Sequence, residues 1–224
     1  MFSWWSQPWA VRTALLVGGC YLVALRAWAS WYQRRAAPRD TTRVDGVNRL
    51  AQLALIPLLL LIALEALFPT FLGQLPLGML TLTPEVEGLL VLLGGIAGGA
   101  GLVVLSWAHQ ALGVHFSLEV QLKEGHRLVQ RGPYRYVRNP IYSGALLLTF
   151  GAAIMLRSPL LLVLCFPFGY GLQRMAAAEV VLLRSTFGAE YQSYLGRTGA
   201  FLPRLGRRPP TDGPSHGPSL RRQG

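Results

Sequence analysis

Two polar segments interrupt an otherwise strongly apolar chain, and they hold the residues that could do chemistry. The first, residues 126–144, reads HRLVQRGPYRYVRNPIYSG and gathers tyrosines and arginines around an Asn139–Pro140 pair. Proline suits the first turn of a helix and asparagine suits its cap. A helix that begins here would present backbone N–H groups to an anion or a carboxylate. The alternative is a belt of Tyr and Arg at a membrane surface.

The second segment, residues 174–203, contains an acid, Glu179, and then the sequence FGAEYQSY. Tyr191 and Tyr194 are three residues apart, so they lie on one face of a helix. An acid beside an apolar run is either solvated or paired with a polar partner. The alternative for this segment is an amphipathic helix on the surface.

The elements that must position these segments are long apolar runs. The chain has 224 residues, of which 52% are hydrophobic and 14% charged, whereas about a quarter of the residues in soluble domains are charged. About 20 apolar residues cross a bilayer as a helix. Five membrane spans are predicted, the last two forming a tight hairpin because Pro159 interrupts their apolar run: Trp9–Trp28, Leu50–Phe68, Gly88–Trp107, Tyr142–Leu156 and Pro159–Leu172. The third is rich in glycine, which lets helices approach closely.

The formal net charge is +11, and its distribution along the chain indicates an orientation. The connections after the first, third and fifth spans are rich in arginine, residues 69–87 contain no Lys or Arg, and the fourth connection holds only Arg157. Positive loops lie on the cytoplasmic side. The N-terminus is therefore expected outside and the C-terminus in the cytoplasm. This alternation favours a multi-pass integral membrane protein and argues against a nucleic-acid partner.

The two cysteines, Cys20 and Cys165, both lie in apolar runs, and no Cys/His cluster is present, so no metal site is expected. The end of the chain, RLGRRPPTDGPSHGPSLRRQG, is rich in Arg, Pro and Gly and cannot build a core. We therefore expect one membrane domain over residues 1–203 and a basic, disordered tail over residues 204–224.

The order GPYRYVRNPIYSG, a helical hairpin, an acid and FGxxYxxY resembles the isoprenylcysteine carboxyl methyltransferase family and its phospholipid methyltransferase relatives. The resemblance covers residues 102–203. It implies an all-α integral membrane enzyme that uses S-adenosyl-L-methionine, with the cofactor at the cytoplasmic ends of the last helices. The implied cofactor contacts are Gln121, His126, Arg127, Leu128, Val129, Tyr134, Asn139, Pro140, Ile141, Tyr142 and Glu179.

The chain departs from the family pattern at the histidine of an RHP motif, where Asn139 stands, and at the second acid of a Glu-Glu pair, where Val180 stands. Asparagine cannot titrate, so proton transfer at position 139 is not expected. The family arginine that contacts the acceptor has no aligned equivalent here, and the candidates for that role are Arg138 and Arg174. Together with Glu179, they are the expected catalytic residues.

The resemblance implies methylation of a lipophilic or prenylated acceptor, with a carboxylate of an isoprenylcysteine-like compound as the favoured target. Transfer from a sulfonium is an in-line displacement, so positioning would dominate catalysis. Two alternatives stay open. The protein could methylate a phospholipid amine or a small thiol, or it could be a non-catalytic membrane scaffold that retains the fold.

Overall fold

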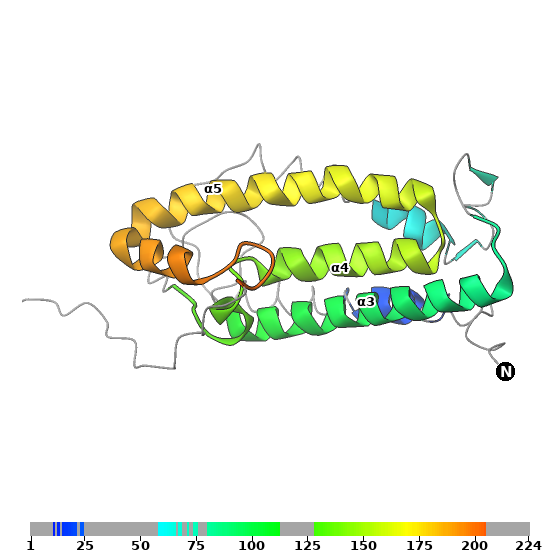
Figure 1. Ribbon diagram of the computed structural model, residues 1–224, viewed down its shortest axis with the longest axis horizontal. Helices are drawn as coiled ribbons and strands as arrows, with labels where there is room; N and C mark the ends of the chain where they lie inside the picture. Colours follow the sequence, from blue (N-terminus) through cyan, green and yellow to red (C-terminus); the bar gives the residue numbers. More distant parts are fainter. Residues whose placement is uncertain are drawn as a thin grey trace, which may run out of the picture.

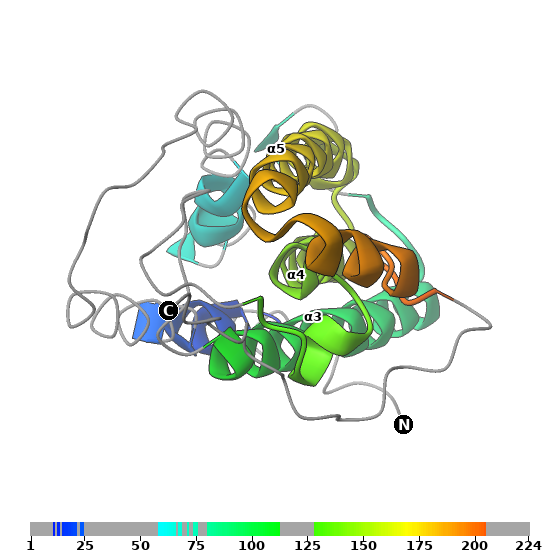
Figure 2. The same ribbon diagram turned by 90° about the vertical axis from the view of Figure 1, so that its left-hand side faces the viewer.

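The computed structural model describes residues 11–24 and 58–75, each with gaps, together with residues 80–112 and 128–204. Its named elements are three α-helices and a short 3-10 helix: α3 (Pro84–Leu112), η3 (Gly132–Arg135), α4 (Pro140–Met155) and α5 (Pro159–Arg197). The described residues of 11–24 and of 58–65 are also helical, within the first two predicted spans. Figure 1 shows α3, α4 and α5 running along the long axis of the molecule, and Figure 2 shows α4 between the other two.

Glycine determines how closely α3 and α4 pack. A methyl group at Gly151 of α4 would lie 2.5 Å from the backbone nitrogen of Gly98 in α3, and one at Gly101 would lie 2.7 Å from the nitrogen of Leu148. Such distances leave no room for a side chain, so the two backbones are in direct contact. The predicted close approach of the glycine-rich third span is confirmed, and small residues at helix contacts are typical of membrane proteins.

The α4–α5 hairpin has the predicted tight turn. Arg157 takes a left-handed conformation with φ of 53°, and the Ser158 side chain accepts a hydrogen bond from the Leu161 N–H at 3.3 Å. Arg157 also forms an ion pair with Glu87 in the first turn of α3. The carboxylate offsets the charge of the only arginine in this connection, which ties the hairpin to the start of α3.

The fifth predicted span, Pro159–Leu172, is the first part of a longer helix. The helix α5 runs for 39 residues to Arg197, and its only non-helical residue is Gly188, with φ of 50° and ψ of −119°. The polar residues from Arg174 onward therefore continue the same helix, because polar side chains at a surface do not end a helix. Beyond Gly188 the chain turns back toward the beginning of α4 (Figure 1).

A hydrophobic core lies between α4 and α5. Its fully buried members include Leu161 and Phe168 of α5 and Ala153 of α4, and Leu58 from the second predicted span packs against them. The described part of the second predicted span thus lies against the α4–α5 hairpin.

Two described helices, α3 and α5, are long and apolar enough to cross a membrane. Their apolar windows are only 28% and 33% buried, so they differ from the core helices of a soluble protein, and their exposed leucine, isoleucine and phenylalanine side chains suit contact with lipid. The helix α4 has 16 residues, or about 24 Å at 1.5 Å per residue, which is short for a span. The all-α membrane character is supported, while the five-span count stays a prediction.

The glycine contact leads to a first prediction. Gly151→Ala should destabilise the protein by about 1–3 kcal/mol, because an added methyl group overpacks a filled interface. Gly99→Ala is the matched control, since a methyl group there meets nothing within 4 Å, and alanine favours a helix by about 1 kcal/mol over glycine. Thermal unfolding in detergent, followed by tryptophan fluorescence, measures both. Equal midpoints for the two variants would contradict the direct backbone contact.

Candidate functional site

A hydrogen bond between α4 and α5 brings the two polar segments together. The Tyr142 hydroxyl, in the first turn of α4, donates to the Glu179 carboxylate on α5 at 2.5 Å. Glu179 is partly buried. The ionised form of a partly buried carboxylate is stabilised by each hydrogen-bond donor or cation near it. Tyr142 and Glu179, which the resemblance names as cofactor contacts, therefore touch each other although they are 37 positions apart.

Tyr134 of η3 is the third residue of the site, beside Tyr142 and Glu179. Its side chain is 8% exposed, and burial raises the pKa of its hydroxyl well above the ordinary value, with the negative charge of Glu179 raising it further. Tyr134 therefore stays a neutral O–H group throughout the physiological range. Its backbone carbonyl accepts a hydrogen bond from the buried Tyr194 hydroxyl at 2.7 Å.

The two tyrosines beyond Gly188 face the same way, as their spacing predicts. Tyr191 and Tyr194 are both buried, and their ring centroids lie 6.0 Å apart. Because the chain turns at Gly188, the final turns of α5 bring these rings back against the start of α4. Their contact with Tyr134 and its neighbours therefore depends on this turn.

Residues 198–204, which we call the terminal strap, pair with the arginine motif through the backbone. The Arg138 N–H donates to the Gly199 carbonyl at 2.8 Å, the Asn139 N–H donates to the Ala200 carbonyl at 3.1 Å, and the Gly199 N–H donates to the Tyr136 carbonyl at 3.3 Å. Val137 and Gly199 thereby form an isolated parallel bridge. These bonds hold both segments at one end of the helices.

The Arg138 side chain is held by the terminal strap and the last turn of α5. One terminal nitrogen of its guanidinium donates to the Thr198 carbonyl at 2.5 Å and to the Leu195 carbonyl at 3.3 Å. Burial lowers the pKa of Arg138, and nearby Tyr191 and Tyr194 oppose that shift. Its Nε atom is buried and has no hydrogen-bond partner among the described residues. One terminal nitrogen of the Arg138 guanidinium is therefore held by two carbonyls, and its Nε–H is free to donate to a ligand.

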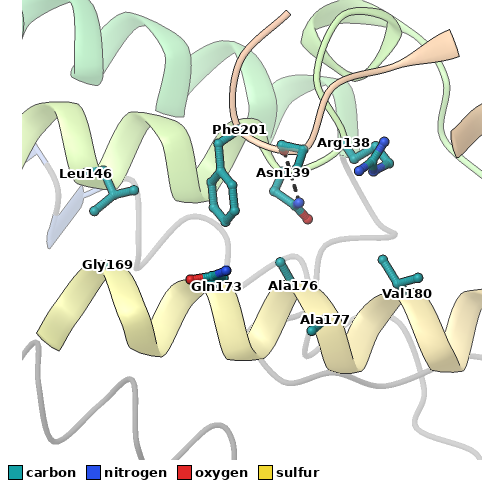
Figure 3. A pocket seen from close by; sticks show the side chains of 10 residues that line it. Arg138, Asn139, Leu146, Gly169, Gln173, Ala176, Ala177, Val180 and Phe201 are labelled. Atoms are coloured by element: carbon teal, nitrogen blue, oxygen red, sulfur yellow. Dashed lines mark hydrogen bonds between the residues drawn. The ribbon is translucent and has the colours of Figure 1, made fainter. Parts of the chain in front are cut away.

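A pocket of about 430 Å³ opens between α4, α5 and the terminal strap. In Figure 3, Arg138 and Val180 lie at one end of it and Leu146 and Gly169 at the other, with Asn139 between. Its lining combines three polar side chains with mostly small or apolar ones: Arg138, Asn139, Leu146, Gly169, Gln173, Ala176, Ala177, Val180, Ala200 and Phe201. The arrangement suits a ligand with an apolar chain and a polar head.

The expected cofactor residues divide into three sets. Gln121, His126 and Arg127 lie outside the described residues. Leu128 and Val129 precede η3 and belong to no helix, and Val129 packs, as Ile141 does, against the cluster that contains Tyr134. The remaining six lie around the start of α4: Tyr134, Asn139, Pro140, Ile141, Tyr142 and Glu179.

The two candidate arginines differ in their surroundings. Arg138 lines the pocket, whereas Arg174 is exposed on α5 and is not part of the lining. Of the two, Arg138 is the one that can reach a ligand held in this pocket.

The prediction that the Asn139 side chain caps α4 is wrong. It occupies the N-cap position of α4, but its side chain makes no capping hydrogen bond. Its amide donates instead to the Ala200 carbonyl at 3.1 Å, because the terminal strap brings an acceptor within reach. Pro140 begins α4 as expected.

The residues of α5 that line the pocket were not predicted from the sequence. Gly169, Gln173, Ala176, Ala177 and Val180 recur at helical spacing along one face. This stripe of small side chains was the available signal. For Ala200 and Phe201 the sequence holds no such signal, because only the fold brings them to α4.

Comparison with known proteins confirms the resemblance to methyltransferases. A family model described as phospholipid methyltransferase matches residues 89–190, from α3 to just beyond the break in α5. Two proteins of Oryza sativa, subspecies indica and japonica, are each named probable protein-S-isoprenylcysteine O-methyltransferase. Both are 32% identical over 90 residues, covering 38% of this chain and 46% of theirs. Protein-S-isoprenylcysteine O-methyltransferase B of Arabidopsis thaliana is 29% identical over 90 residues, covering 38% of this chain and 44% of its own.

The match spans less than half the length of these curated relatives. The residues matched by the family model include the α4–α5 hairpin and both residues of the Tyr142–Glu179 pair. The matched region is therefore of the methyltransferase type. It carries part of the candidate site, and the terminal strap lies beyond it.

Proposed function

We propose that the protein is a membrane methyltransferase that transfers a methyl group from S-adenosyl-L-methionine to a carboxylate of a lipophilic acceptor, such as an isoprenylcysteine-like compound. The observation that carries the proposal is the meeting of Glu179, Tyr142 and Tyr134 beside a largely apolar pocket with an arginine at its end. The family match over the same residues supports it.

The residues around Glu179 suit the cofactor. When bound, S-adenosyl-L-methionine supplies a methyl group on a positively charged sulfur. A carboxylate stabilises such a cation, and the faces of Tyr134 and Tyr142 can do so as well. Since Tyr134 stays neutral, it adds no charge of its own and can donate a hydrogen bond. Glu179, Tyr134 and Tyr142 would hold the cofactor, and Asn139 and Pro140 would shape the space at the start of α4.

The pocket suits the acceptor. Arginine binds a carboxylate through two parallel hydrogen bonds, and Arg138 lies at the polar end of the lining. A carboxylate oxygen attacks without losing a proton, so no general base is needed. Arg138 would orient the carboxylate, and the apolar lining would hold the hydrocarbon and exclude water. Methyl transfer then yields a methyl ester and a neutral thioether.

The pocket also bears on the alternative acceptors. Ligand pockets span about 300–1,000 Å³, and 430 Å³ is small for both chains of a phospholipid. An amine acceptor would have less use for Arg138. Methylation of a phospholipid amine or a small thiol is therefore the second candidate, supported by the family description. A non-catalytic scaffold would have no need of cofactor affinity.

For the membrane, we propose five spans with the N-terminus outside and the site on the cytoplasmic side, because arginine-rich connections alternate with connections poor in arginine. A reporter fused after Gly224 should then be cytoplasmic, and one inserted near Gly73 should be external. Protease protection in sealed vesicles reads both positions. The same side for both reporters would exclude an odd number of spans between them.

The cofactor site leads to a second pair of variants. Glu179→Gln should weaken cofactor binding about tenfold or more, since a hydrogen bond or contact to a charged group contributes about 1.5–3 kcal/mol. Glu190→Gln is the matched control, because Glu190 is an exposed acid of α5 that bonds to Gln130. Calorimetry of the purified protein in detergent gives both dissociation constants. Equal affinities in the two variants, with the fold retained, would remove Glu179 from the cofactor site.

The acceptor site is tested by its two arginines. Arg138→Gln should raise the KM for an S-farnesylcysteine acceptor at least tenfold, because the carboxylate loses its cation, while the dissociation constant of the cofactor stays within about twofold. Arg174→Gln should leave both constants near those of the wild type. Mass spectrometry of the methyl ester measures turnover. An increase in KM confined to Arg174→Gln would assign the acceptor to that residue instead.

A further inference from the structure

The apolar end of the pocket lies where a leucine of α4 meets a glycine of α5. Leu146 and Gly169 both line the pocket, at the end away from Arg138 (Figure 3). A methyl group added at Gly169 would lie 3.4 Å from the Leu146 Cδ2 atom and would meet no other atom within 4 Å. The Leu146 side chain therefore lies directly against the α5 backbone, and the pocket ends at this contact.

Leu146 is held in place by the hydrophobic core. Its side chain packs against the core cluster that contains Phe168 and Leu172 of α5, which are 1% and 5% exposed. A close-packed interior does not admit further methylene groups without strain. A hydrocarbon chain in the pocket would therefore have to stop at Leu146 or bend away from it.

The length of the pocket follows from the helix that forms one wall. Val180, at the end where Arg138 lies, and Gly169, at the other end, are 11 residues apart on α5. The helix is uninterrupted between them, since its non-helical residue is Gly188. At 1.5 Å per residue, the pocket extends for about 17 Å along α5. Ala176 and Ala177 line the middle of this wall with small side chains.

This length can be compared with that of a prenylated cysteine. A fully extended covalent chain advances by about 1.2 Å per bond. Measured from the carboxylate carbon, S-geranylcysteine, S-farnesylcysteine and S-geranylgeranylcysteine then reach about 13, 18 and 23 Å. With the carboxylate at Arg138, the farnesyl chain fills the pocket to Leu146, and the geranylgeranyl chain exceeds it by one prenyl unit.

We propose that Leu146 and Gly169 determine the chain-length specificity of the acceptor, by limiting its hydrocarbon to about three prenyl units. The inference rests on the proposed function, because a carboxylate bound at Arg138 fixes where the chain begins. It narrows the acceptor to carboxylates with chains of the C10 to C15 class and excludes chains of the C20 class.

The test measures binding of the three S-prenylcysteines to the full-length protein in one detergent, by calorimetry. The readout is the ratio of the dissociation constants for the C20 and C15 compounds. Their partitioning into micelles does not depend on the variant, so it cancels when ratios are compared. Leu146→Ala removes three carbon atoms from the end of the pocket and should lower this ratio at least fivefold, because the last prenyl unit no longer has to bend.

Leu147→Ala is the matched control. Leu147 is the next residue of α4, is 36% exposed and does not line the pocket, so the ratio should stay within about twofold of that of the wild type. A ratio that falls equally in both variants, or in neither, would overturn the proposal.

A second variant shortens the pocket and does not remove a side chain from the core. Gly169→Val should raise the ratio of the dissociation constants for the C15 and C10 compounds at least fivefold, because the new methyl groups occupy the end of the pocket. Gly99→Val of α3, where an added methyl group meets nothing within 4 Å, should leave this ratio unchanged. An unchanged ratio in Gly169→Val would show that the chain leaves the pocket before Gly169, and would contradict the limit.

Formation of the methyl ester is measured by mass spectrometry with the same compounds. Length-dependent binding that responds to Leu146→Ala without any methyl ester would contradict the proposed function and support the limit. Methyl esters formed from all three compounds, with the same ratios in wild type and variants, would support the proposed function and overturn the limit.

Discussion

The backbone pairing between residues 136–139 and the terminal strap is the interaction on which the rest of the site depends. Irregular backbone must satisfy its N–H and C=O groups where water is scarce. Arg138 and Asn139 do so through Gly199 and Ala200, and the same contact fastens the Arg138 side chain and completes one wall of the pocket. The arginine motif and the end of the chain are therefore one structural unit, although 60 residues separate them.

That pairing requires a reversal in α5, and Gly188 supplies it. A φ of 50° combined with a ψ of −119° is readily reached by glycine and disfavoured for residues with a Cβ atom. A straight helix would carry Tyr191 and Tyr194 away from α4. Because the chain turns, Tyr194 reaches the Tyr134 carbonyl, and the helix that carries Glu179 also returns the segment that holds Arg138.

Features governed by local rules could be predicted from the sequence. Proline begins α4 and α5, and the glycine-rich span packs closely. The features that could not be predicted depend on partners distant in the sequence. Asn139 bonds to Ala200 instead of capping α4, and the last turns of α5 fold back beyond Gly188. Tyr142 and Glu179 of the two motif segments meet, whereas Ala200 and Phe201 join the pocket only through the fold.

The proposed chemistry follows from two neighbouring faces of one helix. Glu179 and Val180 are adjacent on α5, so their side chains point about 100° apart, as 3.6 residues per turn require. One face presents a carboxylate to Tyr142, and the other borders the pocket that ends at Arg138. A cationic donor and an anionic acceptor would thus be attracted to opposite charges on adjacent faces, and the start of α4 is where they would meet. Since an in-line displacement needs alignment above all, the rigid α4–α5 contact would contribute more to the rate than any titrating group.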